Sequence, residues 1–176
     1  MKKTAKTTVQ SIVVLLLIAI LSGLLLAICN YIFYVEPADG ITLLKEVENA
    51  NWSKQNSDII DYTIGVVNTV ATAQSKIGFV VVGEPYLKAK EFSVAVIIDA
   101  NTDTVEKVVI LQSGASAPTY DIKNSSLEIV IGMRIRSATT FDNISPKNLQ
   151  SGATQSATVV LNALKCVARY YAENVL

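Results

Sequence analysis

The residues with the clearest chemical potential lie where a polar loop passes into an apolar segment of helical spacing, in the stretch LQSGATQSATVV (149–160). The tetrapeptide SGAT (151–154) opens the predicted helix, and the hydroxyls of Ser156 and Thr158 follow. The first turn of a helix presents unpaired N–H groups and a positive dipole end, which attract phosphate. A threonine hydroxyl at that place can be esterified to a phosphate, and small neighbours let a phosphorylated ligand approach the backbone.

The same stretch also fits an ordinary helix start. A serine or threonine hydroxyl commonly caps a helix by accepting a hydrogen bond from a free backbone N–H, and glycine permits a tight approach. Capping accounts for Ser151 and Gly152, but it leaves Thr154 without a role. Both interpretations stay open at this level.

The composition limits what other chemistry the chain can perform. It contains no histidine, which excludes Ser-His-Asp and Cys-His catalysis as well as histidine-ligated metals and haem. Of its two cysteines, Cys29 lies inside the apolar N-terminal run and Cys166 lies near the C-terminus, so we do not expect them to pair. Two thiols are also too few for an iron–sulfur cluster within one chain. We expect Cys166 to behave as a small buried apolar residue. Redox chemistry would therefore need a cofactor held by something other than thiolate or imidazole.

The N-terminal region predicts a membrane anchor. Residues 12–33 (IVVLLLIAILSGLLLAICNYIF) carry no charge and are long enough to cross the hydrocarbon core as a helix. Lys2, Lys3 and Lys6 precede this run, so the positive-inside rule places the N-terminus in the cytoplasm. A cleaved signal peptide is the alternative, but its apolar core would be shorter and would end in a small-x-small site. We therefore expect a cytoplasmic segment (1–8), a transmembrane anchor (9–35) and an extracytoplasmic domain (36–176).

The charges of the exported part argue against nucleic acid as a partner. Three of the 15 basic residues precede the apolar run, which leaves 12 basic against 15 acidic residues in the remainder. No basic stripe interrupts this slightly acidic composition, and such a stripe is the usual signature of nucleic-acid binding. We predict no nucleic-acid partner.

The pattern of the exported part predicts an α+β domain in which helices close a small antiparallel sheet. Alternation over 92–99, turn residues at 101–104 and an apolar run over 105–111 predict a hairpin. Helices are expected over 41–50 and 155–173, the latter with a buried stripe at Val159, Val160, Ala163, Leu164, Val167 and Tyr171. A further strand is expected over 78–83 and another over 127–131. The segment 57–76 shows helical spacing but has β-branched residues that suit strands equally well; we favour a helix there.

These features together resemble the FMN-binding domain family. An SGAT motif opens a C-terminal helix behind a single N-terminal anchor and an exported α+β domain, as in the G subunit of the Rnf electron-transport complex and the C subunit of the sodium-translocating NADH:quinone oxidoreductase. The resemblance implies that a flavin transferase moves FMN from FAD onto Thr154 as a phosphoester. It also implies that Ser151, Gly152 and Ala153 are recognition residues. We add Ser156 as a further cofactor-binding candidate.

Two positions depart from the family pattern. The family usually has an aspartate six residues before the acceptor threonine, where this chain has Asn148. The Glu-Thr-Pro-Gly stretch that commonly follows the hairpin is replaced here by SGASAPTY (113–120). By location alone, Thr119 and Tyr120 are the candidates for contact with the flavin ring.

The resemblance implies that the chain is an electron-carrying subunit, not catalytic alone, of an ion-translocating Rnf-type ferredoxin:NAD oxidoreductase in the plasma membrane. Its partners would be the other membrane subunits and the flavin transferase. Two alternatives remain: a membrane-tethered interaction or scaffold domain without flavin, and a stand-alone extracytoplasmic flavin reductase.

Overall fold

The N-terminal helix α1 spans Lys2–Phe33 in the computed structural model, which describes residues 2–33, 39–55, 58–84, 92–112 and 121–176. The chain divides into two compact units, Met1–Pro37 and Ala38–Leu176. In α1, the side chains of residues 12–28 are exposed, and the Ser22 hydroxyl donates to the carbonyl of Ile18 at 2.7 Å. Within the part of the chain that the structure describes, no helix is long and apolar enough to cross a membrane.

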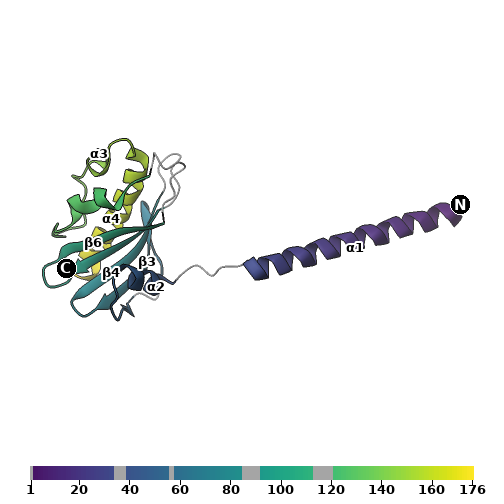
Figure 1. Ribbon diagram of the computed structural model, residues 1–176, viewed down its shortest axis with the longest axis horizontal. Coiled ribbons are helices and arrows are strands. Elements are labelled where there is room, and N and C mark those ends of the chain that lie inside the picture. Colours follow the sequence, from purple (N-terminus) through teal and green to yellow (C-terminus); the bar gives the residue numbers. More distant parts are fainter. Residues whose placement is uncertain (1, 34–38, 56–57, 85–91, 113–120) are drawn as a thin grey trace. The chain divides into compact units, whose positions relative to one another are not determined.

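The second unit is built on a six-stranded antiparallel sheet (Figure 1). Its strands run in the order β1-β3-β4-β5-β6, and β2 also pairs with β3. The strand bounds are Ser53–Lys54 (β1), Ile60–Tyr62 (β2), Gly65–Ala73 (β3), Lys76–Gly83 (β4), Phe92–Asp99 (β5) and Thr104–Gln112 (β6). Sequential strands are therefore neighbours from β3 to β6, as expected of hairpin connections.

Helices cover both faces of this sheet. The helix α2 (Gly40–Val47) lies on one face, where Leu44 and Trp52 pack on Ala95 and Ile97 of β5. The other face carries the long C-terminal helix α4 (Thr154–Asn174), with the short α3 (Pro146–Leu149) and the 3-10 helix η2 (Asn124–Val130) beside it. The α+β class and the antiparallel sheet with a C-terminal helix are thus confirmed.

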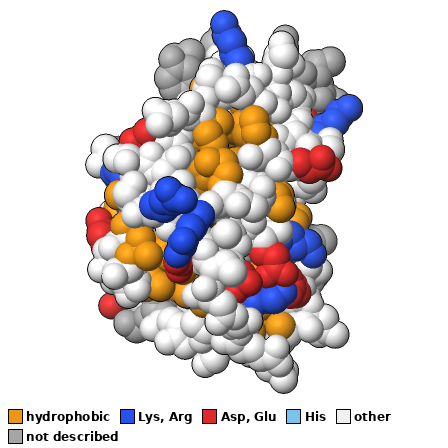
Figure 2. Space-filling view, turned by 90° about the vertical axis from the view of Figure 1, so that its left-hand side faces the viewer, with side chains coloured by type: hydrophobic (Ala, Val, Ile, Leu, Met, Phe, Trp, Pro, Cys, Tyr) orange, Lys and Arg blue, Asp and Glu red, His pale blue; other side chains and the backbone are white. Residues whose placement is uncertain are grey.

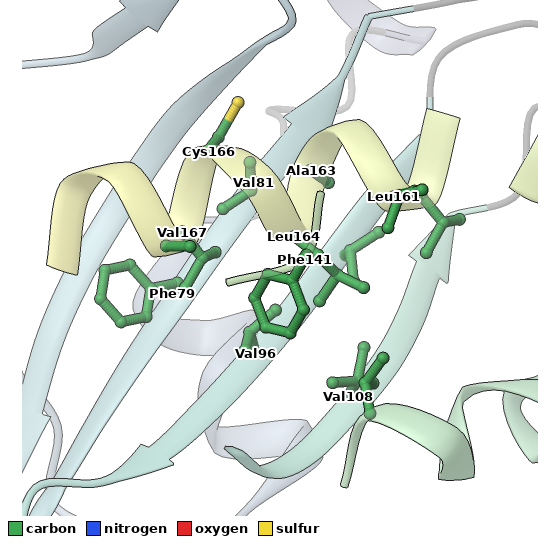
Figure 3. Close-up of a cluster of buried hydrophobic side chains, with 14 of the residues drawn as sticks. Phe79, Val81, Val96, Val108, Phe141, Leu161, Ala163, Leu164, Cys166 and Val167 are labelled. Carbon is green, nitrogen blue, oxygen red and sulfur yellow. The ribbon is translucent and has the colours of Figure 1, made fainter. Parts of the chain in front are cut away.

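The larger apolar core lies between α4 and the sheet. All six residues of the predicted α4 stripe are buried, and Leu164 and Val167 point toward Val96 and Phe79 of the sheet (Figure 3). The rings of Phe79 and Tyr170 meet edge to face, with centroids 5.6 Å apart and an interplanar angle of 73°. Because each fully buried aliphatic or aromatic side chain contributes about 1.5–3 kcal/mol, this stripe is the main attachment of α4.

The predicted hairpin is confirmed, as are the helices over 41–50 and 155–173 and the strand over 78–83. The alternation over 92–99 also indicates a strand with one buried face, and this is wrong because both faces of β5 are buried. Its even-numbered residues pack under α4, while Ala95 and Ile97 are buried under α2.

The helix favoured over 57–76 is wrong, because this segment forms β2 and β3. A bulge between Val67 and Thr69 interrupts the alternation of β3. As a result Val67 and Val70, three residues apart, both belong to the core beneath α4, while Ala71 and Ala73 face α2. One extra residue in a strand therefore reproduced the spacing that is typical of a helix.

The strand expected over 127–131 is also wrong, because residues 124–130 form the 3-10 helix η2. Leu127 and Val130 are its buried residues, and their spacing of three matches a 3-10 turn. The side-chain oxygen of Asn124 accepts a hydrogen bond from the N–H of Ile110 at 2.8 Å. A side chain therefore satisfies a backbone donor of β6 that a neighbouring strand would otherwise have paired.

The turn between β5 and β6 is tied to the far end of α4. Asp103, in the left-handed conformation with φ 57°, pairs with Arg134 at 3.0 Å and accepts a hydrogen bond from the buried Tyr171 hydroxyl at 2.9 Å. The Arg134 bond, helped by Tyr171, lowers the pKa of the Asp103 carboxyl. Burial, followed by the bond to Asp103, raises the pKa of Tyr171 to about 12. Tyr171 is therefore a proton donor to a carboxylate over the whole ordinary pH range.

We predict that Gly83→Ala destabilises the fold. A Cβ at this position would lie 2.1 Å from the carbonyl oxygen of Val159 in α4, and backbone cannot move aside without displacing the helix. We expect a loss of about 1–3 kcal/mol in the free energy of unfolding. Urea unfolding of the full chain, followed by the fluorescence of Trp52, measures it. Gly78→Ala is the control: its Cβ would meet side-chain atoms of Trp52 and Leu44 at 2.9–3.0 Å, which can shift at lower cost. Equal losses in the two variants would contradict the prediction.

We also predict that in Tyr171→Phe the free energy of unfolding falls less as the pH is lowered than it does in wild type. Since the folded-state pKa of Asp103 is depressed, its contribution is present above the unfolded pKa of about 3.9 and is lost as the pH falls through the folded pKa. Removing one of the bonds that depress this pKa should lower the free energy of unfolding by about 1–3 kcal/mol at neutral pH, and by less as the pH falls toward 3. Urea midpoints measured between neutral pH and pH 3 test this. Tyr170→Phe, which removes a hydroxyl not bonded to Asp103, should leave the pH dependence unchanged.

Candidate functional site

The SGAT motif makes a sharp left-handed turn into α4. Gly152 has φ +91°, a conformation that residues with side chains rarely adopt, and apart from its chain neighbours no described residue lies within 4 Å of where its Cβ would be. Ala153 is the residue that flanks the helix, with φ −114° and ψ 41°, and its carbonyl accepts from the N–H of Ala157 at 2.9 Å. Thr154 is consequently the first residue of the helix. Glycine is needed at 152 for its backbone conformation, and the space beside it is open.

The hypothesis that a hydroxyl of the motif caps the helix is wrong. The capping position is occupied by Ala153, which has no hydroxyl, and within the described ranges no side-chain hydrogen bond caps α4. The turn at Gly152 places Ser151 outside the capping position and brings Thr154 already into the helix. The first N–H groups of a helix have no intrahelical partner. The first turn of α4 also contains no acidic residue that would offset its positive end.

Thr154 is an exposed side chain at this uncapped helix start, and Ser151 and Gly152 beside it are exposed too. Among the described residues, no side-chain hydrogen bond engages the Thr154 hydroxyl. Its backbone carbonyl, in contrast, accepts a bond from the hydroxyl of Thr158 at 2.8 Å. The hydroxyl of Thr154 is therefore accessible to a reactant from solvent, while its backbone is fixed in the first helical turn.

Two of the predicted site residues lie beneath the surface. Ala153 and Ser156 are each 2% exposed, and Ala153 belongs to the buried apolar residues. The small size of Ala153 thus serves the packing of the helix start on the core. Ser156 supports the first turn from inside, and its position does not favour direct contact with a ligand on the surface.

The helix start lies at one particular end of the sheet. Gly83, the last residue of β4, lies under Val159 of α4, and it pairs with Phe92, the first residue of β5. The next residue, Ser93, pairs with Gln112, the last residue of β6. The described ends of three strands therefore meet near the start of α4. Thr119 and Tyr120, the predicted ring contacts, lie outside the described residues.

A residue that the sequence did not single out links the motif to the chain before η2. The side-chain oxygen of Gln150 accepts from the N–H of Lys123 and the hydroxyl of Ser126, each at 2.9 Å. Its side-chain nitrogen donates to the carbonyl of Asp121 at 2.8 Å. No local pattern distinguishes this glutamine from any other polar residue in a loop, because its partners are more than 20 residues away.

Asn148, which stands where the family has an aspartate, is exposed on α3. Its backbone N–H donates to the carbonyl of Ser145 at 2.8 Å. The side chain is therefore accessible to a protein that approaches the motif.

Cys166 has a purely structural position. Its side chain is fully buried in the core on the α4 side of the sheet (Figure 3), as predicted, and it is a free thiol. Burial raises the pKa of the Cys166 thiol to about 11, so it is protonated at neutral pH. A buried, protonated thiol is a poor nucleophile and a poor metal ligand.

A polar cavity of about 550 Å³ lies at the opposite end of the sheet, by the turn between β3 and β4. It is lined by Glu48, Asn49, Ala50, Asn51, Ala73, Gln74 and Lys76. The Lys76 ammonium group bonds to Glu106 at 2.7 Å and also to Glu48. These bonds raise the pKa of Lys76, which keeps it protonated and unsuited to act as a base.

Charged side chains of both signs are interspersed on the face of the molecule shown in Figure 2, around a group of apolar side chains. That face shows no continuous area of a single charge. It therefore gives no support to a strongly charged macromolecule as its partner.

A scan against protein-family models and searches of curated proteins and of solved structures found no match for this chain.

Proposed function

We propose that this chain is an electron-transfer subunit of an ion-translocating membrane redox complex of the Rnf type, and that it carries FMN as a phosphoester on Thr154. The observation that carries the proposal is the exposed threonine at an uncapped helix start. An open space beside Gly152 and the absence of an acidic residue from the first turn of α4 also suit a phosphate. The likeness of the SGAT motif to the FMN-binding domain family supports the choice of ligand.

In this proposal Thr154 is the acceptor of the FMN phosphate. The Thr154 hydroxyl oxygen forms a bond to the phosphorus of the FMN half of FAD, and the bond from that phosphorus to the AMP half breaks. AMP leaves, and the hydroxyl proton passes to water. N–H groups of the first turn of α4, which have no intrahelical partner, would stabilise the charge of the resulting phosphodiester. FMN, when bound, supplies the electron-transfer chemistry, for which the side chains of this composition have no substitute.

The N-terminal helix would anchor the domain. The large aliphatic side chains of residues 12–28 are exposed in α1, and exposed apolar surface of this extent is stable in lipid or against other membrane subunits. Lys2, Lys3 and Lys6 favour a cytoplasmic N-terminus. In this arrangement the domain from residue 36 onward is extracytoplasmic, and the partners are the other membrane subunits and the flavin transferase.

We predict that Thr154→Val abolishes the covalent flavin. Valine has the shape of threonine but lacks the oxygen that forms the ester. The full chain is produced together with a flavin transferase, washed membranes are resolved on a denaturing gel, and flavin fluorescence and intact mass are recorded. Wild type should carry one FMN in the membrane fraction, and Thr154→Val none.

The matched control is Thr158→Val, which removes a hydroxyl one turn further along the same helix. This hydroxyl bonds only to the Thr154 carbonyl among the described residues, so flavinylation should persist. A wild-type chain without flavin, or a fluorescent band that survives Thr154→Val, would contradict the proposal.

A scaffold domain without flavin is the second candidate, and Asn148 is the observation that favours it. If a carboxylate at this position contacts the transferase, the neutral amide leaves the chain a poor substrate. We predict that Asn148→Asp raises the initial rate of flavin transfer by about tenfold, since a hydrogen bond to a charged group contributes roughly 1.5–3 kcal/mol. The exposed side chain lets the substitution leave the fold intact.

Time courses of in-gel fluorescence for wild type and Asn148→Asp measure this rate. Lys147→Gln, a charge change at the neighbouring exposed position, controls for general electrostatics. An unchanged rate in Asn148→Asp would show that the departure from the family pattern does not limit the transfer.

A further inference from the structure

We propose that Gln150 is a positioning residue that fixes the acceptor segment 151–156 against segment 121–126 and so determines how Thr154 is presented. Its side chain is half-buried and makes three hydrogen bonds, to Lys123, Ser126 and Asp121. A side-chain amide can make about four such bonds, so the geometry uses most of its capacity. This inference extends the proposed function, on which its flavin readout rests.

The bonds of Gln150 hold the start of η2. Lys123 is the residue that flanks this 3-10 helix, and it has no side-chain cap of its own. The side-chain oxygen of Gln150 accepts from both the N–H of Lys123 and the hydroxyl of Ser126, so it satisfies the N–H of the flanking residue as the third helical residue does in a capping box. Gln150, which directly precedes the acceptor segment, thereby replaces a local cap.

Segment 121–130 is held from two sides. On the sheet side, Asn124 accepts from the N–H of Ile110 in β6, and Leu127 and Val130 are buried in the core. On the other side, Gln150 provides the three bonds to residues 121–126. The contacts of segment 121–130 with the sheet do not depend on Gln150. We therefore expect replacement of Gln150 to release the acceptor segment while segment 121–130 stays packed on the sheet.

The backbone of Gln150 is fixed as well. Its N–H donates to the carbonyl of Pro146 at 3.2 Å at the end of α3, and the left-handed turn at Gly152 comes two residues later. Thr154 is therefore four residues from an anchored side chain and lies directly after a turn that only glycine makes easily. Reactive groups misplaced by about 1 Å can lose roughly 100-fold in rate, so this anchor bears on the transfer step.

The test uses the full chain and four variants of it. Gln150→Leu keeps the approximate size and removes all three bonds, and Gln150→Glu keeps the two acceptor bonds while losing the donor to Asp121. Ser126→Ala removes one partner from the opposite side, and the double variant with Gln150→Leu completes a mutant cycle. Hydrogen exchange is measured on the chain without flavin, and the rate of flavin transfer and the circular dichroism of the bound flavin are measured after exposure to the transferase.

In Gln150→Leu we expect about tenfold faster exchange, confined to 121–126 and 150–156, with the rest of α4 protected as in wild type. The transfer rate should fall by about 10- to 100-fold, and the flavin dichroism should change. Gln150→Glu should give exchange and transfer rates between those of wild type and Gln150→Leu. Ser126→Ala should change these rates little further once Gln150 is replaced by leucine. A merely structural role would instead raise exchange along the whole of α4.

Unchanged exchange in 150–156, or faster exchange with an unchanged transfer rate and dichroism, would overturn the inference. The exchange measurement does not require flavin. If the wild type carries none, the proposed function fails, while faster exchange of 150–156 in Gln150→Leu still supports Gln150 as the anchor of this segment and unchanged exchange overturns it.

Discussion

The close packing of α4 on the sheet is the constraint on which the remaining structure depends. The helix can lie directly on the strands only because Gly65 and Gly83 have no side chains there: a Cβ at Gly83 would meet the Val159 carbonyl, and one at Gly65 would approach the Cys166 sulfur at 3.1 Å. This approach lets the apolar stripe of α4 fill the core against β3, β4 and β5. Close-packed interiors leave little room for a shifted helix.

The position of the helix start follows from that packing. With Val159 over Gly83, Thr154 falls near the end of the sheet where β4 and β6 end and β5 begins. Tyr171 fixes the opposite end of α4 through Asp103, so the helix is held at both ends. Gly152 then turns the chain, and Gln150 joins it to segment 121–126. The exposed Thr154 is thus the first residue of a helix that is held at both ends. Precise placement of a reactive group requires such a rigid support.

Local patterns predicted the elements wherever one period was uninterrupted. The strand β5 and the stripe of α4 keep a regular spacing, and both were predicted correctly; the two register shifts of the hairpin skip residues of β6 and leave the alternation of β5 intact. The segment that forms β3 misled the prediction, because the bulge after Val67 shifts the alternation and imitates helical spacing. The 3-10 helix η2 was missed because Leu127 to Ile131 are typical strand residues, and the bond from Asn124 that takes the place of strand pairing comes from tertiary contact.

The sequence by itself determined which reactive side chains the protein has. It has no histidine and only two cysteines, and it has one threonine in a motif of small residues before an amphipathic helix. The tertiary structure decided which of those residues are accessible. Ser156 is buried because it lies on the side of α4 that packs on the core, and Ala153 is buried directly before the helix, whereas Thr154 is exposed at an uncapped helix start because Gly152 adopts a left-handed turn. It also supplied Gln150, whose role depends on partners that only the folding of distant segments brings within hydrogen-bonding distance.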